Sequence, residues 1–242
     1  MSERRKARGP RGRPRRAVVL VFGESDHDRR AIRHLTEGLR PDLVGKVEPR
    51  SAPLVLIKNA TREHAKSNAQ RIAELARQEM AAREVLAVLA HEDCDATEPA
   101  HVAATQRIEE ELRAAGSPYP IGVTPAWEIE AWWMLFPEAV GCVVEGWREP
   151  RDWIGRDVGA VRHAKEALAR AVRPRGHPRS PLRDYLERDS IPIASNIASQ
   201  GLLDSFSEGA RRTKRANGTV QEARSASFGA FRAKVAGIPR GK

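Results

Sequence analysis

The stretch Val85-Leu-Ala-Val-Leu-Ala-His-Glu-Asp-Cys-Asp-Ala96 decides the fold that we expect for this chain. Its first six residues carry no charge and are rich in branched side chains, which is typical of a fully buried parallel strand. Three acids, Glu92, Asp93 and Asp95, follow directly. They would lie at the carboxyl end of the strand, where open α/β sheets place their ligand sites.

The spacing of these acids indicates a metal site. In an extended segment the side chains alternate, so Asp93 and Asp95 would point the same way and Glu92 the other way. Two neighbouring carboxylates repel each other unless a cation lies between them. Mg²⁺ suits such a place, because it binds one or two carboxylates and keeps room for water and phosphate oxygens. The alternative is a polar loop after a core strand, with acids that cap the next helix.

The same strand-then-acid pattern occurs earlier in the chain. Residues 17–24 predict a buried strand that ends in Glu24, followed by Ser25 as the N-cap of a helix that Pro41 terminates. The other predicted elements are a strand over 52–58, a helix with Ala69, Ile72, Ala73, Ala76 and Met80 inward, a helix with Val102, Thr105, Ile108 and Leu112 inward, and a strand over 119–123. This order predicts an α/β fold with a parallel sheet flanked by helices on both faces. Glu24 and Asp93 would then lie on the same side of the sheet.

The segment 125–137 reads as one helix with Glu128 and Glu130 near its start, where the helix dipole favours acids. All five tryptophans of the chain fall between residues 127 and 153. Such a cluster is usually core or subunit interface, and the alternative is that one or two of the rings stack on nucleic-acid bases.

Beyond about residue 148 the sheet pattern is lost. We expect a helix over 160–172 that carries His163 and Lys165. A basic connector over 173–181, short helices over 182–188, 193–203 and 228–235, and a polar loop over 211–224 would complete this half. The expected organisation is a disordered basic arm (1–16), an α/β domain (17–147) and a helical C-terminal appendage (148–242).

Composition narrows the class of protein. The formal net charge is +10, and residues 1–16 carry most of it, because eight basic side chains there face one acid. Such an arm would bind polyanions without specificity, or would only keep the protein soluble. Two cysteines form no disulfide framework, and neither a signal peptide nor a membrane-spanning apolar run is recognisable, so we expect a cytoplasmic protein without membrane contact.

Several common signatures are absent from the sequence. There is no Gly-x-x-x-x-Gly-Lys-Ser/Thr loop, no His-Glu-x-x-His, no Cys-x-x-Cys pair and no Gly-x-Ser-x-Gly. The sequence therefore argues against a P-loop NTPase, a zinc protease, a zinc finger and an α/β-hydrolase.

Glu24 after the first strand and Asp93-x-Asp95 after a later one together resemble the Toprim domain, the metal-binding module of topoisomerases, bacterial primases and OLD-type nucleases. More closely, the chain is similar to a bacterial family of unknown function related to those nucleases. The segments that carry this resemblance are Glu24, His91 to Asp95, Glu128 to Trp132 with Leu135 to Pro137, Lys165, and Ser225 to Phe231. It covers about residues 17–236.

The resemblance implies a Toprim-like α/β fold and Mg²⁺ or Mn²⁺ held by Asp93 and Asp95. Glu24 would be a further ligand or the general acid/base. The third acidic position would fall to Glu130 or to Glu128. Relatives of this kind imply an ATPase partner and a role in anti-phage defence.

Three hypotheses follow for function. The first is a metal-dependent nuclease or phosphodiesterase acting on DNA or RNA, in which Lys165 neutralises the scissile phosphate. The second is a non-catalytic Toprim-like scaffold that binds an ATPase or nucleic acid. The third is a sequence-independent nucleic-acid binder that acts through the arm, whose deletion would abolish binding.

Overall fold

The computed structural model describes residues 15–51, 62–173, 183–214 and 218–241. Its centre is a parallel sheet of four strands in the order β2-β1-β3-β4. The strands are β1 (Ala17–Phe22), β2 (Val47–Pro49), β3 (Glu84–His91) and β4 (Pro120–Val123). The α/β class and the parallel sheet flanked by helices are thereby confirmed. The predicted strand over 52–58 and nearly all of the basic arm lie outside the described residues.

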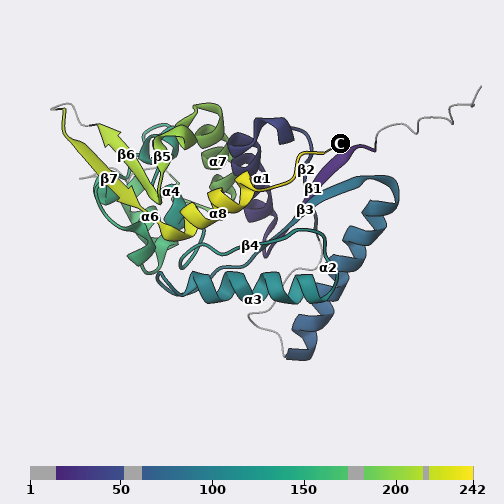
Figure 1. The fold of residues 1–242 in the computed structure, drawn as a ribbon. Coiled ribbons are helices and arrows are strands. Elements are labelled where there is room, and N and C mark those ends of the chain that lie inside the picture. The colour runs from purple at the N-terminus through teal and green to yellow at the C-terminus, as the bar shows by residue number, and fades with distance from the viewer. Residues whose placement is uncertain (1–14, 52–61, 174–182, 215–217, 242) are drawn as a thin grey trace, which may run out of the picture.

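Helices cover both faces of this sheet (Figure 1). The flanking helices are α1 (Asp26–Leu39), α2 (Arg62–Ala82), α3 (His101–Ala114), α7 (Ser190–Ser199) and α8 (Ala226–Ala236). One face, which carries Val18, Leu20 and Phe22, packs against α2 and α3. The other face, which carries Val19 and Val21, packs against the larger core that α1, α7 and α8 complete. Successive side chains of β1 point to opposite faces of the sheet, so each face contacts its own hydrophobic layer.

Helix α1 begins and ends as its sequence predicts. The Ser25 side chain accepts a hydrogen bond from the backbone N–H of Asp28 at 3.0 Å, and the helix ends at Leu39, before Pro41. Two expectations about neighbouring helices are wrong. Met80 on α2 is 42% exposed and Val102 on α3 is 57% exposed. Each residue lies at the margin of the buried stripe of its helix, so its side chain points partly to solvent.

The expected single helix over 125–137 is wrong as well. The helical part is α4 (Glu130–Trp133), and α5 (Pro137–Gly141) follows separately. Residues 125–127 are not helical, and the carbonyl groups of Pro125 and Trp127 accept hydrogen bonds from another segment. The backbone N–H of Cys94 donates to the carbonyl of Pro125, and that of Asp95 donates to the carbonyl of Trp127, at 3.3 and 3.0 Å. Trp127 itself has a φ of +60°.

The C-terminal half is not purely helical. It contains a three-stranded antiparallel sheet of β5 (Phe206–Ser207), β6 (Ala210–Lys214) and β7 (Val220–Arg224). The loop expected over 211–224 is therefore wrong. The strand pattern is hidden because Arg211 faces inward, where it pairs with Glu138 and donates to the carbonyl of Leu135. Its side chain is buried although its type suggests the surface.

The predicted helix over 228–235 is confirmed as α8 (Ala226–Ala236), and the other predicted helices of this half are shorter than expected or displaced. Helix α6 covers Ala164–Val172 rather than the whole of 160–172, and α7 starts three residues before the predicted position. In 183–188, the described part of the segment predicted as a helix over 182–188, only a 3₁₀ turn, Glu187–Asp189, begins near the end.

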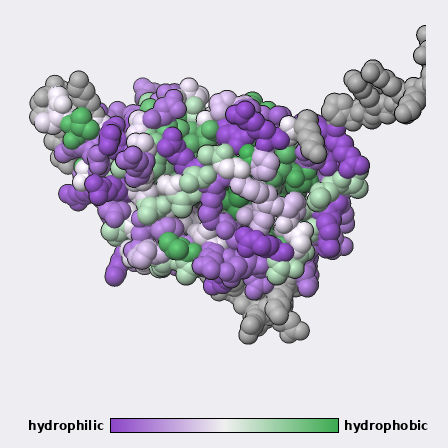
Figure 2. All heavy atoms as spheres, viewed as in Figure 1, coloured by the Kyte–Doolittle hydropathy of each residue, from purple (hydrophilic) through white to green (hydrophobic). Residues whose placement is uncertain are grey.

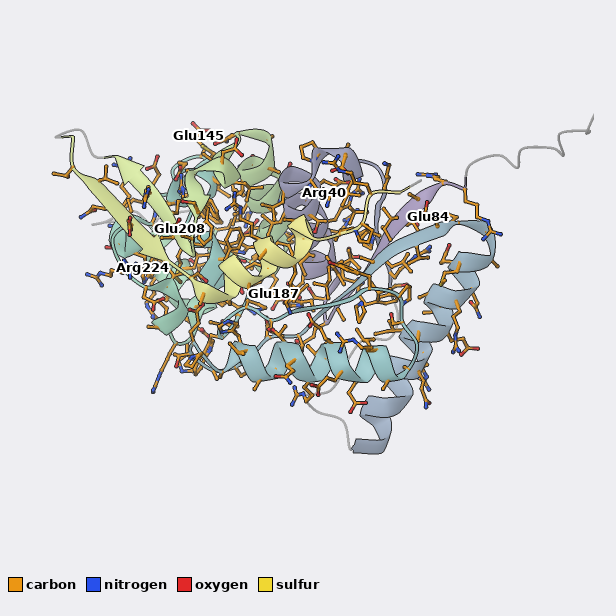
Figure 3. All side chains as sticks on the ribbon, in the orientation of Figure 1. Arg40, Glu84, Glu145, Glu187, Glu208 and Arg224 are labelled. Carbon is orange, nitrogen blue, oxygen red and sulfur yellow. The ribbon has the colours of Figure 1, made fainter. Side chains whose placement is uncertain are left out.

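The C-terminal half packs into the same core as the first half. Helix α7 lies along α1, and the approach is so close that a Cβ on Gly38 would lie 2.7 Å from the Cβ of Ala198. Arg40, labelled in Figure 3, donates to the carbonyl groups of Ala236 and Ile238 at 3.2 and 2.8 Å and so fixes the end of α8. Residues before and after position 148 share one hydrophobic cluster.

The visible surface is mainly polar, in contrast to the apolar interior. Figure 2 shows mainly hydrophilic residues on the visible face, with apolar residues scattered between them. Among the described residues, none of the helices is both long and apolar enough to cross a membrane.

Candidate functional site

The acids predicted as ligands come from the carboxyl edge of the parallel sheet. Phe22 pairs with Ala90 across β1 and β3, so both strands run out at the same edge, and the turns that carry Glu24 and Asp93 start beside each other. The chain after β3 then runs along the chain after β4, because the backbone N–H of Glu92 donates to the carbonyl of Val123 at 3.2 Å. This places the residues before α4 at the same edge.

A buried histidine lies at the centre of this edge. His91 is fully buried, and its Nε2 lies 3.3 Å from Oδ1 of Asp93, while its Nδ1 lies 3.9 Å from Oδ2 of Asp28. Burial alone would lower the pKa of His91. The contact with Asp93 and the charges of Asp28, Asp93 and Glu24 outweigh burial and raise that pKa to about 9. His91 therefore carries a proton at neutral pH and partly balances the acids around it.

Glu130 is the most deeply buried acid of the site. It opens α4, is 4% exposed and accepts a hydrogen bond from the Tyr185 hydroxyl group at 2.9 Å. Burial, together with the negative charge of Asp93, raises the pKa of Glu130 to about 8. Glu130 is thus largely a neutral carboxylic acid at neutral pH.

Glu128 and Lys165 meet at the start of α6. The backbone N–H of Lys165 donates to Oε2 of Glu128 at 3.0 Å, and the ammonium group of Lys165 pairs with Glu187, which Figure 3 labels. Burial and the charge of Asp93 raise the pKa of Glu128 as well. Lys165 also feels the charges of Glu128 and Glu130. These residues therefore form one electrostatic group around Asp93.

Asp95 lies differently from the prediction. Strand β3 ends at His91, and Asp95 has a φ of +49°. The regular alternation that was to aim Asp93 and Asp95 the same way therefore stops before it reaches Asp95. The structure brings Glu24, Asp93, Glu128, Glu130 and Lys165 to one edge, and Asp95 lies exposed on the following turn.

The donor chemistry of this edge fits a hard divalent cation, since it is made of carboxylates. Burial and mutual repulsion raise the pKa of two of these acids, and a cation among them would relieve both effects. In the part of the chain that the structure describes, however, no three His, Cys, Asp or Glu side chains are grouped closely enough to hold a metal ion. To bind a metal ion, Asp93 would have to give up its contact with His91, or Glu128 its hydrogen bond from the backbone N–H of Lys165.

Two of the segments that carry the resemblance, Glu128 to Trp132 and Ser225 to Phe231, also contact each other in the core. Glu98 caps α8 through its carboxylate, which accepts hydrogen bonds from the backbone N–H groups of Ala226 and Ser227, both at 2.8 Å. The Ser227 hydroxyl accepts a hydrogen bond from the indole N–H of Trp132 at 3.0 Å. The Glu-Ile-Glu-Ala-Trp segment and the Ser-x-Ser-Phe-x-x-Phe segment are therefore joined in the core.

The tryptophan cluster is mostly interior. Trp132 and Trp133 are fully buried and Trp147 is 7% exposed. Base stacking by these three rings is therefore excluded in this conformation. Trp127, which is partly exposed, contacts the ring of His163 edge-on at 4.7 Å between ring centroids.

Sequence reasoning missed three residues of this site. In the sequence His91 stands out only as the first residue of an acidic segment, and nothing in the local sequence singles out Tyr185 or Ser190. The Tyr185 hydroxyl donates to Glu130, and Ser190, the first residue of α7, lies within hydrogen-bond distance of the Tyr185 hydroxyl, a tertiary arrangement that no local pattern reveals. Comparison of the chain with protein-family models, with curated proteins and with solved structures finds no match.

Proposed function

We propose that the carboxyl edge of the sheet is the site of a metal-dependent phosphodiesterase that acts on nucleic acid. One observation carries the proposal: Glu24, Asp93, Glu128 and Glu130 gather at one edge, where burial and the charge of Asp93 raise the pKa of the last two. Acids held together against their own repulsion favour a cation, and strongly shifted groups of this kind are typical of functional sites.

Mg²⁺ or Mn²⁺ would be held by Asp93, with Glu24 or Glu128 as further ligands, whereas Asp95 would join them only through a movement of its exposed segment. A bound divalent metal ion would supply Lewis-acid polarisation of a phosphoryl oxygen and an acidified water molecule. The resemblance to Toprim nucleases supports this assignment. It also extends the proposal to an ATPase partner and to a role in anti-phage defence.

The side chains of the protein have separate tasks in this proposal. Glu24 accepts a proton from the attacking water. Glu130 is protonated at neutral pH and is suited to donate a proton to the leaving oxygen. Lys165, whose side chain is 39% exposed, offers its positive charge to the phosphate. His91 places its positive charge 3.3 Å from Oδ1 of Asp93 and so offsets part of the negative charge of the site.

A non-catalytic scaffold is the second candidate. The specific observation in its favour is that protonated His91 already compensates the charge of Asp93 without a metal ion. In this case the fold would bind an ATPase or nucleic acid, and metal ions would change nothing.

A cleavage assay tests the proposal. Supercoiled plasmid, single-stranded DNA and RNA would each be incubated with Mg²⁺, Mn²⁺ or EDTA. We expect cleavage of at least one substrate by the wild type in metal and none in EDTA, because the metal supplies the acidified water. The Asp93→Ala/Asp95→Ala variant should fall to the EDTA background.

Asp204→Ala is the matched control, since Asp204 is an exposed acid beyond α7. It should cleave like the wild type. Equal cleavage by the wild type and by Asp93→Ala/Asp95→Ala would contradict the assigned site. Absence of cleavage by the wild type, with or without an ATPase partner, would favour the scaffold.

A further inference from the structure

Three residues with an unfavourable backbone conformation meet beside the acids of the carboxyl edge. Among the described residues five non-glycine residues have a positive φ, and Asp95, Trp127 and His163 are three of them. The backbone N–H of Asp95 donates to the carbonyl of Trp127 at 3.0 Å, and the rings of Trp127 and His163 lie 4.7 Å apart between their centroids. Bulky side chains seldom adopt this backbone region, and residues held there cluster at ligand sites.

Trp127 differs from the tryptophans of the core. The indole N–H groups of three other tryptophans donate within the protein, from Trp132 to Ser227, from Trp133 to Ser190 and from Trp147 to the carbonyl of Arg183. Within the described part of the chain the indole N–H of Trp127 has no such acceptor, and its ring is partly exposed. Since a tryptophan that is buried for packing usually satisfies its N–H group, Trp127 is presented at the surface.

The Trp127 ring is nevertheless held in place. The backbone N–H of Trp127 donates to the carbonyl of Ala96 at 2.8 Å, so both backbone polar groups of this residue are bonded to the segment that follows β3. The His163 ring contacts the indole edge-on, with 63° between the ring planes. A ring that is restrained in advance loses little conformational freedom when a ligand stacks on it.

Positive side chains accompany this ring. Glu128 follows Trp127 and accepts a hydrogen bond from the backbone N–H of Lys165 at 3.0 Å, so residues 127–128 and 163–165 lie side by side. The Lys165 side chain, which pairs with Glu187, is still 39% exposed. Arg162, which precedes His163, is exposed and forms no ion pair with another described residue.

An aromatic ring beside positive charges is the arrangement with which proteins bind single-stranded nucleic acid. The ring stacks on a base, and the cations attract the phosphates on either side of it. In a duplex both faces of each base are covered by neighbouring base pairs, so a single protein ring finds no free face there. The surroundings of Trp127 therefore favour a single strand.

We propose that Trp127, supported by His163, is a stacking platform for one base of a single-stranded nucleic acid. This inference rests on nucleic acid as the partner in the proposed function, and it adds the strandedness of the substrate and the residue that selects it. It does not depend on which acids hold a metal ion.

The test is the binding of a fluorescein-labelled oligothymidylate of roughly twelve nucleotides to the full chain, beside a duplex of the same length. Fluorescence anisotropy would be measured in EDTA and in Ca²⁺, a cation that carboxylates bind. Trp127→Leu removes the aromatic face and should weaken binding of the single strand roughly tenfold. Binding of the duplex should change less than about twofold, because charged side chains attract both ligands and only the single strand offers a free base.

Trp127→Phe is the conservative variant. It keeps an aromatic ring and should bind the single strand within about threefold of the wild type. Leucine and phenylalanine are both unbranched at Cβ, so the two variants place the same demand on the backbone at position 127. Trp153→Leu is the matched control, because Trp153 is also partly buried and packs at the margin of the core. It should bind both ligands like the wild type.

The outcomes distinguish this inference from the proposed function. Equal affinity of the wild type and Trp127→Leu for the single strand would overturn the stacking platform alone. An equal loss for single strand and duplex, or a loss in Trp127→Phe as large as in Trp127→Leu, would overturn it as well. A wild type that binds neither ligand would overturn nucleic acid as the partner, and this inference with it.

Discussion

Raising the pH from 6.5 to about 8 in the presence of EDTA should lower the free energy of unfolding by on the order of 3 kcal/mol. The folded protein holds one proton on Glu130 up to a pKa of about 8, whereas an unfolded chain releases it near the ordinary value of 4.5. It holds another on His91 up to a pKa of about 9, whereas the unfolded chain releases that proton near 6.5.

The sign follows from the proton count. In this pH range the folded state binds more protons than the unfolded state, so stability falls as the pH rises. The contribution of His91 is complete below about pH 6.5 and is lost through pH 9, and the cost of burying Glu130 is absent below pH 4.5 and complete above pH 8. Each proton changes the free energy of unfolding by about 1.4 kcal/mol per pH unit where it is fully retained.

Urea denaturation at both pH values measures this difference. Glu130→Gln is the matched variant, because glutamine keeps the carbonyl oxygen that Tyr185 requires but does not ionise. It should lose roughly half of the pH dependence and be more stable than the wild type at pH 8. A wild-type stability that is constant or rises over this range would contradict the protonation states assigned to His91 and Glu130.

Trp132→Ala should reduce the free energy of unfolding by about 3–5 kcal/mol. Trp132 is fully buried, its ring stacks on Phe231 at 5.1 Å and meets Phe228 edge-on at 5.3 Å, and its N–H donates to Ser227. Alanine would leave a cavity at the junction of α4 and α8. It would also deprive the buried Ser227 hydroxyl of a donor.

Trp153→Ala is the control for this prediction, because Trp153 is only partly buried at the edge of the same core. Its loss should be clearly smaller in the same urea titration. If Trp132→Ala were as mild as Trp153→Ala, the tryptophan cluster would not be the structural core described above.

The parallel sheet was predictable because its signals are local. The runs 17–22 and 85–90 carry no charged side chain on either face of the strand, so they predict strands that are buried on both faces. Ser25 and Pro41 mark the limits of α1. The antiparallel sheet was missed because Arg211 is an inward residue of β6, so the alternation of polar and apolar residues is lost there. Its burial depends on Glu138, which is distant in the sequence.

The candidate site was predictable only in part. The turns after β1 and β3 follow from the parallel order, so Glu24 and Asp93 could be placed at one edge. The left-handed backbone at Asp95 and the non-helical conformation of 125–127 accompany hydrogen bonds between the segments that follow β3 and β4. The approach of Tyr185 to Glu130, and of Ser190 to Tyr185, depends on tertiary packing. The Toprim resemblance stays a prediction.

The most direct measurement for the central claim is thermal unfolding of the wild type and of Asp93→Ala/Asp95→Ala, in EDTA and in saturating Mn²⁺. A ligand at a hundred times its dissociation constant stabilises the folded state by about 2.7 kcal/mol, which for a chain of this size raises the unfolding temperature by roughly 5 to 10 °C. We expect that rise for the wild type and its absence in the variant. An unfolding temperature of the wild type that is the same in Mn²⁺ and in EDTA, or an equal rise in both proteins, would contradict a metal site at the carboxyl edge of the sheet.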